Sequence, residues 1–261
     1  MKLTILGSGI YVFLKDRKGP AYLLEVGDQK ILLDCGWGFG PNLLEAGYTI
    51  YELDHIVISH PHADHMGGLM NITQSMKGGR HFPEYYRKKP LYLHGYKGFK
   101  KDFETLQNIM NPEKDEWYEI KIFEYEDNQN SIGELKISGV EVKHNPHLFH
   151  SSAYRIEHNG KSLAYSGDSS YDEQLVKVSN NADFALFESS NPPKLFKEQG
   201  PKPNHLSPFE AGKLAHAAGV KKLGLIHVYF HLTSEEEITE EVRKNFKGEL
   251  LFPKDLQSIQ I

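Results

Sequence analysis

The sequence predicts an α/β (α+β) fold with two sheets and helices on the outside. Three observations support this prediction. Short runs of β-type residues alternate with helical patterns along the 261 residues. Each run closes on a glycine or a polar residue. The sequence has no strong linker or shift in composition, so we expect one domain, 1–261, with two similar halves at about 1–130 and 131–261.

In the first half, apolar runs predict strands and spaced apolar residues predict helices. Gly27-Asp28 separates two runs in the manner of a hairpin turn. Gly78-Gly79 and Asn111-Pro112 are typical of helix ends. We expect strands at residues 3–6, 22–26, 30–33, 56–59, 90–94 and 117–124, helices at about 66–76 and at 99–110, and, past the midpoint, a further strand at 135–143.

The second half continues in the same style. Asn159-Gly160 suits a type I′ turn between two strands. Ser207 and Glu210 form the pattern of a capping box, and the helix that follows closes at Gly219. We expect strands at residues 153–157, 162–166, 183–187, 222–226 and 250–252, and a last helix from about 234 to 246.

Composition excludes several classes of protein. Lys and Arg total 30 and Asp and Glu total 35, so the formal charge of −5 excludes a generally basic nucleic-acid coat. Cys35 is the one cysteine, which excludes an intramolecular disulfide and a multi-cysteine metal cage. The longest apolar runs are about five residues, too short for a membrane span. The N-terminal residues have the pattern of a first strand and not of a signal peptide, so we expect a cytoplasmic protein.

Three histidines and an aspartate lie within residues 60–65, directly after an apolar strand. Imidazole and carboxylate groups are natural ligands of zinc, iron and manganese. His60 and His62 are two apart in extended chain and point to one side, whereas Asp64 and His65 lie past the bend and suit a second centre. The alternative is a polar loop with hydrogen-bonding histidines. The full H-x-H-x-D-H pattern favours metal binding.

This motif resembles the metal-binding signature of the metallo-β-lactamase superfamily, whose fold is a four-layer αββα sandwich of two similar halves. The remaining landmarks occur in order, so the resemblance covers nearly the whole chain. It implies a dinuclear metal centre. The implied ligands are His60, His62 and His147 for the first metal, Asp64, His65 and His227 for the second, and Asp168 between them.

Two of these positions have alternatives. His144 and His150 compete with His147, and the spacing to Tyr154 favours His147. Asp34 resembles the strand-end aspartate of the family, and its expected role is to orient a ligand histidine through the free ring nitrogen. Plain solvation at a strand end is the alternative for Asp34.

Residues 204–211 resemble the histidine motif of ribonuclease Z and related small phosphodiesterases. The resemblance implies that His205, assisted by a nearby Glu, handles the proton of the leaving oxygen. Glu210 is the candidate for that Glu, although helix capping explains it without catalysis. A surface position next to the helix is the alternative for His205. Together with Asp64, these are the candidate catalytic residues.

The sequence also departs from ribonuclease Z. That family carries a basic arm that clamps transfer RNA, whereas only a tight hairpin stands between Tyr154 and Asp168 here. We therefore expect a dinuclear hydrolase of a small phosphodiester or cyclic nucleotide-like substrate, or of RNA. The expected cofactors are two divalent metal ions, zinc first, with manganese or iron as alternatives.

The second candidate activity is hydrolysis of a lactone, thioester or β-lactam, because acyl and phosphate hydrolysis use the same attacking water. A non-hydrolytic iron redox site ranks below it. We expect a small phosphodiester or ester as partner, with RNA as the alternative, and no membrane. The oligomeric state is left open, a homodimer included.

Overall fold

The computed structural model describes residues 1–261 apart from 81, 83–86, 88, 113–117 and 200–203. The chain divides into two compact units. Unit 1 comprises Met1–Glu124 and Asp255–Gln260, and unit 2 comprises Tyr125–Lys254 with Ile261. The grouping of both units into one domain stays a prediction.

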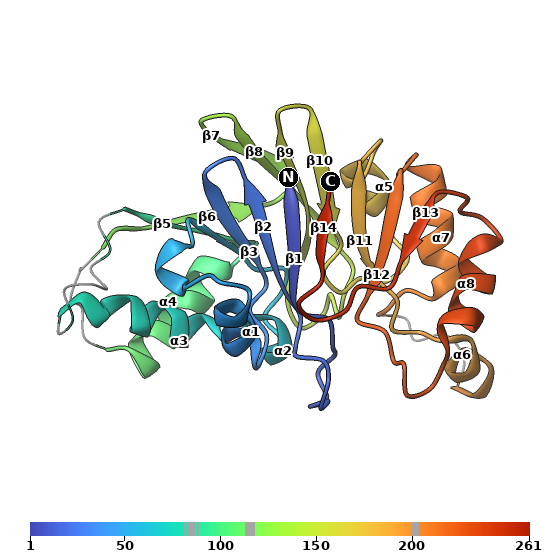
Figure 1. Cartoon of the computed structure of the whole chain (residues 1–261), viewed down its shortest axis with the longest axis horizontal. Helices are drawn as coiled ribbons and strands as arrows, with labels where there is room; N and C mark the ends of the chain where they lie inside the picture. Colours follow the sequence, from blue (N-terminus) through green and yellow to red (C-terminus); the bar gives the residue numbers. More distant parts are fainter. Residues whose placement is uncertain (81, 83–86, 88, 113–117, 200–203) are drawn as a thin grey trace. The chain divides into compact units, whose positions relative to one another are not determined.

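Unit 1 is built on a mixed sheet. Its strands are β1 Lys2–Gly7, β2 Ala21–Val26, β3 Gln29–Leu33, β4 His55–Val57, β5 Leu91–Tyr96, β6 Ile120–Tyr125 and β14 Ser258–Gln260. They are ordered β14-β1-β2-β3-β4-β5-β6 (Figure 1). Pairing is antiparallel from β14 to β3 and parallel from β3 to β5. The two ends of the chain therefore lie side by side in β1 and β14.

The helices of unit 1 share a core with this sheet. They are α1 Phe39–Glu45, α2 Ala63–Met66, α3 Leu69–Ser75 and α4 Phe99–Met110, with 3-10 turns η1 Ile50–Glu52 and η2 Met76–Arg80. Strand residues such as Leu23, Ile56 and Leu93 pack with Leu69 of α3 and Phe99 of α4 in one buried cluster. Burial of such apolar side chains supplies most of the stabilising free energy of the unit.

Unit 2 holds a second mixed sheet. Its strands are β7 Asn128–Ile132, β8 Leu135–Val142, β9 Ser151–His158, β10 Lys161–Tyr165, β11 Phe184–Glu188, β12 Lys222–Ile226 and β13 Glu249–Leu251. Their order is β13-β12-β11-β10-β9-β8-β7. Pairing is parallel from β13 to β10 and antiparallel from β10 to β7.

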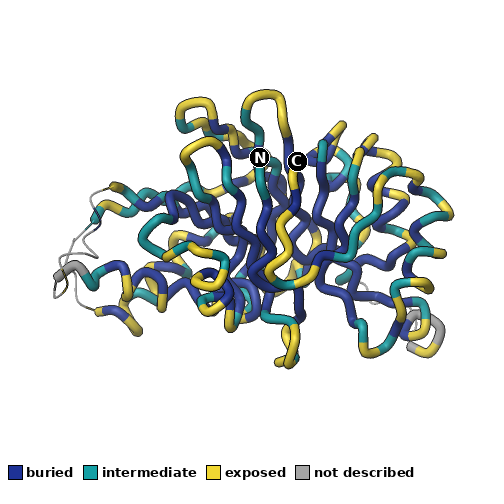
Figure 2. Tube along the Cα trace, viewed as in Figure 1, coloured by how far each residue is buried: buried dark blue, intermediate teal, exposed yellow. Residues whose placement is uncertain are grey.

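Helices also cover the sheet of unit 2. They are α5 Gln174–Val178, α6 Pro193–Gln199, α7 Pro208–Ala217 and α8 Glu235–Arg243, and α7 packs against both α5 and α8 (Figure 1). Ala211 and Leu214 of α7 join Phe187 and Leu225 of the strands in a buried cluster. Figure 2 shows most strand residues buried, with exposed residues in the connections and on the helices.

Local sequence signals predict most of these elements. The capping box that opens α7 is confirmed, because Ser207 Oγ accepts from Glu210 N and the Glu210 carboxylate accepts from Ser207 N. Asn159 and Gly160 both have positive φ in the turn between β9 and β10, as predicted. Residue 117, the first of a predicted strand, lies outside the described residues, and β6 begins at Ile120.

The predicted helix at 66–76 is instead two helices, α2 and α3, with Gly67 and Gly68 between them. Gly68 N donates to Cys35 O at 2.8 Å, and an added Cβ at Gly68 would lie 2.7 Å from that oxygen. This close approach needs glycine, and it ties the histidine motif to the loop after β3. Within the described part of the chain, no helix has the length and apolar character needed to cross a bilayer.

Two buried histidines stabilise unit 1 away from the motif. His55 on β4 and His94 on β5 lie with Nδ1 and Nε2 3.0 Å apart, and His55 Nε2 donates to Gln29 Oε1 at 3.0 Å. Because Gln29 Oε1 can only accept, His55 Nδ1 carries no proton and accepts from His94. Burial lowers the pKa of His55 to about 4 and lowers the pKa of His94 well below its usual value.

Acidification should therefore destabilise the protein. Between pH 6.5 and about 4 the unfolded chain protonates His55 and the folded chain does not, so stability is full above pH 6.5 and falls as the pH drops. From pH 7 to pH 5 this costs about 2 kcal/mol for His55 alone. Urea unfolding of the metal-free protein measures the free energy of unfolding at pH 7 and at pH 5. The decrease between the two should be smaller in His55→Gln than in the parent by about 2 kcal/mol. Equal losses in both proteins would contradict this role of His55.

Candidate functional site

In both units the candidate residues follow the ends of parallel strands of one sheet. Asp34 comes directly after β3, and residues 59–65 follow β4. In unit 2, Asp168 follows β10 and His227 follows β12. The carboxyl ends of parallel strands meet at one edge of a sheet, where α/β proteins commonly bind ligands.

The backbone turns sharply at these strand ends. Asp34 has φ of 51° and His227 has φ of 54°, in the left-handed region that non-glycine residues rarely occupy. Such strain persists only where the surroundings hold the residue in place, and it gathers at functional sites.

A buried carboxylate organises the motif of unit 1. Asp34 is fully buried. Its Oδ1 accepts from Ser59 N, and its Oδ2 accepts from Ser59 Oγ, both at 2.7 Å. Asp34 Oδ2 also lies 2.6 Å from His65 Nδ1. This is the contact expected of a residue that orients a ligand histidine.

These hydrogen bonds fix which ring nitrogens carry protons. Ser59 Oγ gives its proton to Asp34, so it accepts from His60 Nδ1 at 3.0 Å. His65 Nδ1 donates to the Asp34 carboxylate. In their neutral forms both rings therefore have the lone pair on Nε2, the form in which imidazole binds a metal.

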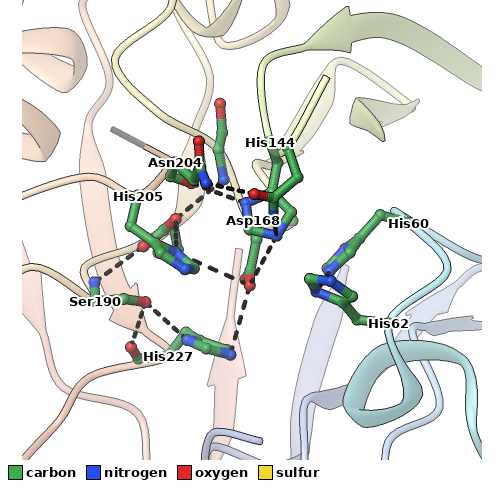
Figure 3. Close-up of polar contacts among 12 residues, drawn as sticks. His60, His62, His144, Asp168, Ser190, Asn204, His205 and His227 are labelled. Carbon is green, nitrogen blue, oxygen red and sulfur yellow. Dashed lines mark hydrogen bonds and ion pairs between the residues drawn. The ribbon is translucent and has the colours of Figure 1, made fainter. Parts of the chain in front are cut away.

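The other members of the motif face the same region of unit 1. His60 Nε2 lies 3.0 Å from His62 Nδ1, and the two side chains are seen in Figure 3. Asp64 is in the first turn of α2, and its Oδ2 lies 3.5 Å from His65 Nε2. Three imidazoles and a carboxylate thus gather their ring nitrogens and oxygens within unit 1, a donor set suited to zinc, iron or manganese.

Asp168 is the centre of the corresponding cluster in unit 2 (Figure 3). Its Oδ2 lies 3.6 Å from His227 Nε2 and 3.9 Å from His144 Nε2, which is too long for a hydrogen bond. Ligands of one tetrahedral zinc ion lie roughly 3.3–3.6 Å apart, because each bond is about 2.0–2.2 Å long. The spacing of His227 fits shared metal ligation, and that of His144 is slightly wider.

The protons of these two histidines are also fixed by acceptors. Ser190 Oγ donates to the backbone oxygen of His227 at 2.9 Å, so it accepts from His227 Nδ1 at 2.7 Å. His144 Nδ1 donates to Asn204 O at 2.8 Å. Both rings turn Nε2 toward Asp168, and in the neutral ring this nitrogen has the lone pair. Burial also lowers the pKa of His144, which keeps this ring neutral at pH 7.

The structure places His147 differently from the prediction. His147 is exposed in the turn after β8, where Leu148 N donates to Asn145 O, and His150 is exposed beside Glu141. His144 is buried and is the histidine of this segment that faces Asp168. The spacing to Tyr154 favours His147, whereas the turn at 145–148 leaves the His147 side chain exposed.

The sequence patterns did not identify Glu188 as a site residue. Its carboxylate contacts and positions His205. It ends β11, is fully buried, and lies with Oε1 2.8 Å from His205 Nδ1. Its two oxygens also accept from Ser169 N and Ser190 N at 3.0 and 2.9 Å. The sequence does contain a signal for Glu188, because an acidic residue at the end of an apolar strand repeats the pattern seen at Asp34.

Glu210 has a different position from the one expected of a catalytic partner. Its Oε2 accepts from Ser207 N at 2.8 Å and from Ser207 Oγ at 2.7 Å, so the carboxylate closes the capping box of α7. His205 Nδ1 lies 4.0 Å from Asp168 Oδ2, next to the cluster of unit 2. The carboxylate seen beside His205 is that of Glu188.

The two clusters and the two mixed sheets define a metal-dependent hydrolase of the metallo-β-lactamase fold, and the predicted fold and class are confirmed by related proteins. The structure of the metallo-β-lactamase fold protein YhfI from Bacillus subtilis superposes with a TM-score of 0.83 at 24% identity, over 99% of this chain and 98% of that one. The chain belongs to the family described as "Anti-Pycsar protein Apyc1", whose model matches residues 1–190.

Sequence relatives point to the same class. The "Probable metallo-hydrolase YhfI" of Bacillus subtilis is 26% identical over 96% of this chain and 96% of its own length. A ribonuclease Z of Archaeoglobus fulgidus is 24% identical over 100% of this chain and 97% of its own. A diphosphatase of the PhnP family has a similar structure, with a TM-score of 0.72 at 19% identity over 100% of this chain and 97% of that one.

Substitution of the two rival histidines separates their roles. Loss of a residue that only hydrogen-bonds a metal ligand lowers metal affinity by about 10–100-fold. If His144 itself binds the metal, His144→Ala should lower zinc affinity by more than this. His147→Ala should bind zinc like the parent, because its side chain is exposed. Competition with a zinc chelator measures both affinities. Loss of zinc in His147→Ala with retention in His144→Ala would restore the original assignment.

Proposed function

We propose that this protein is a phosphodiesterase that hydrolyses a small phosphodiester or cyclic nucleotide-like substrate, with RNA as the larger alternative. One observation carries the proposal. His205, fixed by the buried Glu188 carboxylate at 2.8 Å, stands 4.0 Å from Asp168. A histidine in this setting can supply the proton that an alkoxide leaving group requires.

The proposed metal ligands come from both clusters. They are His60, His62, Asp64, His65, Asp168 and His227, with His144 in place of His147. Assignment of all of them to two metal ions rests on the family pattern. Two bound divalent ions, with zinc first and manganese or iron as alternatives, would lower the pKa of the attacking water and neutralise phosphate charge.

His205 is proposed to protonate the leaving oxygen through Nε2. Its Nδ1 proton stays on the hydrogen bond to Glu188, which orients the ring and stabilises its charged form. The fully buried Glu188 is held by two backbone N–H groups, so it cannot rotate away from His205 without losing them. Glu188 therefore replaces Glu210 as the assisting carboxylate in this proposal.

The preference for a small substrate has two supports. β9 and β10 are joined directly by Asn159-Gly160, so this hairpin holds no arm of the kind that the resemblance to ribonuclease Z implies. The net charge of −5 gives little long-range attraction for a polyanion. The names of the relatives, ribonuclease Z and a diphosphatase, favour a phosphorus centre over an acyl centre.

Metal content tests the dinuclear centre. Elemental analysis after purification with zinc should approach two equivalents per chain. Asp168→Ala and His227→Ala should lose metal, turnover and thermal stability together, because metal binding stabilises the folded state. One equivalent in the parent, unchanged in His227→Ala, would contradict the two-metal assignment.

The choice of leaving group tests His205. His205→Ala should slow hydrolysis of a cyclic nucleotide, whose leaving group is an alkoxide, by about 10²–10⁴-fold. It should slow bis(p-nitrophenyl) phosphate much less, because p-nitrophenolate leaves without a proton. Glu188→Gln should show a weaker effect of the same form.

The control for this experiment is Glu237→Gln, which alters the capping-box glutamate of α8 and should not change the ratio of the two rates. If His205→Ala lost the same factor in hydrolysis rate on both substrates, His205 would not be the proton donor. Turnover of a lactone or nitrocefin, with none of any phosphodiester, would replace the proposal by the acyl hydrolase.

A further inference from the structure

The loop between β1 and β2, residues 8–20, is fastened by one carboxylate of the C-terminal segment. Asp255, which precedes β14, accepts through Oδ1 from Ser8 N at 2.8 Å and from Ser8 Oγ at 2.7 Å. Its Oδ2 accepts from Lys18 N at 2.8 Å and from Asn42 Nδ2 of α1 at 3.1 Å. Four donors therefore meet on one side chain, and hydrogen bonds to a charged acceptor are the stronger kind.

This loop ends at Gly19-Pro20, which packs on the loop after β3. Gly19 N donates to Trp37 O at 3.0 Å. In the reverse direction, Gly36 N donates to Pro20 O at 2.9 Å. No side chain would fit between the two backbones, because an added Cβ at Gly36 would lie 2.7 Å from the carbonyl carbon of Gly19. Packing this close transmits a shift of one loop to the other.

The loop after β3 supports in turn the two proposed metal ligands of α2. Cys35 N donates to His65 O at 2.7 Å. An added Cβ at Gly36 would lie 2.1 Å from Asp64 O, so the backbone of α2 also rests directly on this loop. Contacts between backbone segments thus lead from Asp255 to both proposed ligands, and all of these contacts lie within unit 1.

Asp255 is connected to the proposed ligands through these loops. Its four hydrogen bonds go to residues 8, 18 and 42, which are not candidate ligands. Metal ligands must be held within about 0.5 Å of the binding geometry by the groups that surround them. The hydrogen bonds of Asp255 restrain the loop on which the loop after β3 rests, and they therefore restrain the ligands.

We propose that Asp255 is a positioning residue for the metal ligands Asp64 and His65. Its carboxylate holds residues 8–20, these residues hold the loop after β3, and that loop holds the start of α2. The inference rests on the proposed function, because Asp64 and His65 are metal ligands in that proposal. It gives the C-terminal segment of the chain a part in shaping the metal site.

Asp255→Asn tests the proposal in the full-length protein. The Asn amide has one acceptor oxygen in place of two, so it cannot serve all four donors. Competition with a zinc chelator, under conditions in which every variant is folded, should show zinc affinity lowered by about 10-fold. In the metal-free variant, the Cys35 amide should exchange its hydrogen with solvent faster than in the parent, relative to amides in the centre of the sheet.

Asp54→Asn is the matched control in the same unit. The Asp54 carboxylate also accepts from a backbone N–H, that of Lys30 at 2.9 Å. Asp54 directly precedes β4, so it lies at the opposite edge of the sheet from residues 59–65, which follow that strand. This variant should lower thermal stability and leave both zinc affinity and the relative exchange of the Cys35 amide unchanged.

A second variant keeps the test decisive if Asp255→Asn does not fold. Ser8→Ala removes one donor to Asp255, and it should lower zinc affinity in the same direction by a smaller factor. Circular dichroism checks the folding of each variant. Zinc affinity equal to that of the parent in every folded variant, or an equal loss of affinity in Asp54→Asn, would overturn the proposal.

The two proposals can fail independently. Hydrolysis of a phosphodiester by the zinc-loaded parent, with no effect of Asp255→Asn on zinc affinity, would keep the proposed function and remove the role of Asp255. Zinc binding that weakens in Asp255→Asn, without hydrolysis of any phosphodiester, would remove the proposed function and keep Asp255 as a positioning residue of the metal site.

Discussion

Each unit depends on one buried carboxylate at the end of a strand. Asp34 and Glu188 are fully buried, and a lone charge in such a place would cost several kcal/mol. The cost of burying each carboxylate is offset in the same way, by hydrogen bonds from serine residues in a loop and from one histidine. Since these carboxylates must keep their partners, the loops that carry the candidate site are held to the sheets. The site geometry follows from this requirement of burial.

The proton positions follow from the same networks. Four histidines each place Nδ1 beside an oxygen that accepts its proton. The pairs are His60 with Ser59, His65 with Asp34, His144 with Asn204, and His227 with Ser190. In the neutral form, each of these rings therefore offers Nε2 with its lone pair. A set of structural histidines would not need this uniformity, whereas ligands of a metal do, because a metal binds neutral imidazole through an unprotonated nitrogen.

Short-range patterns reveal part of this arrangement in the sequence. The strand-end positions of Asp34 and residues 60–65 can be read from apolar runs, and so can the capping box at Ser207. The contact of His144 with Asn204, and that of Glu188 with His205, join loops far apart in the chain, and no local pattern carries them. The spacing to Tyr154 predicts His147, and spacing alone does not reveal the turn that leaves this side chain exposed. Glu210 is near His205 in the sequence but caps α7, whereas the carboxylate beside His205 is that of Glu188 on β11.

The short segment from Glu188 to Asn191 links two proposed functions. Glu188 holds the proposed proton donor His205, and Ser190 holds the proposed ligand His227 while its N–H fixes Glu188. Asn191 N donates to Leu206 O, next to His205 in the sequence. Because one segment holds both histidines, a change in it cannot shift the proposed ligand without also shifting the proposed proton donor. In our proposal, metal binding and protonation of the leaving oxygen are therefore coupled through one strand end.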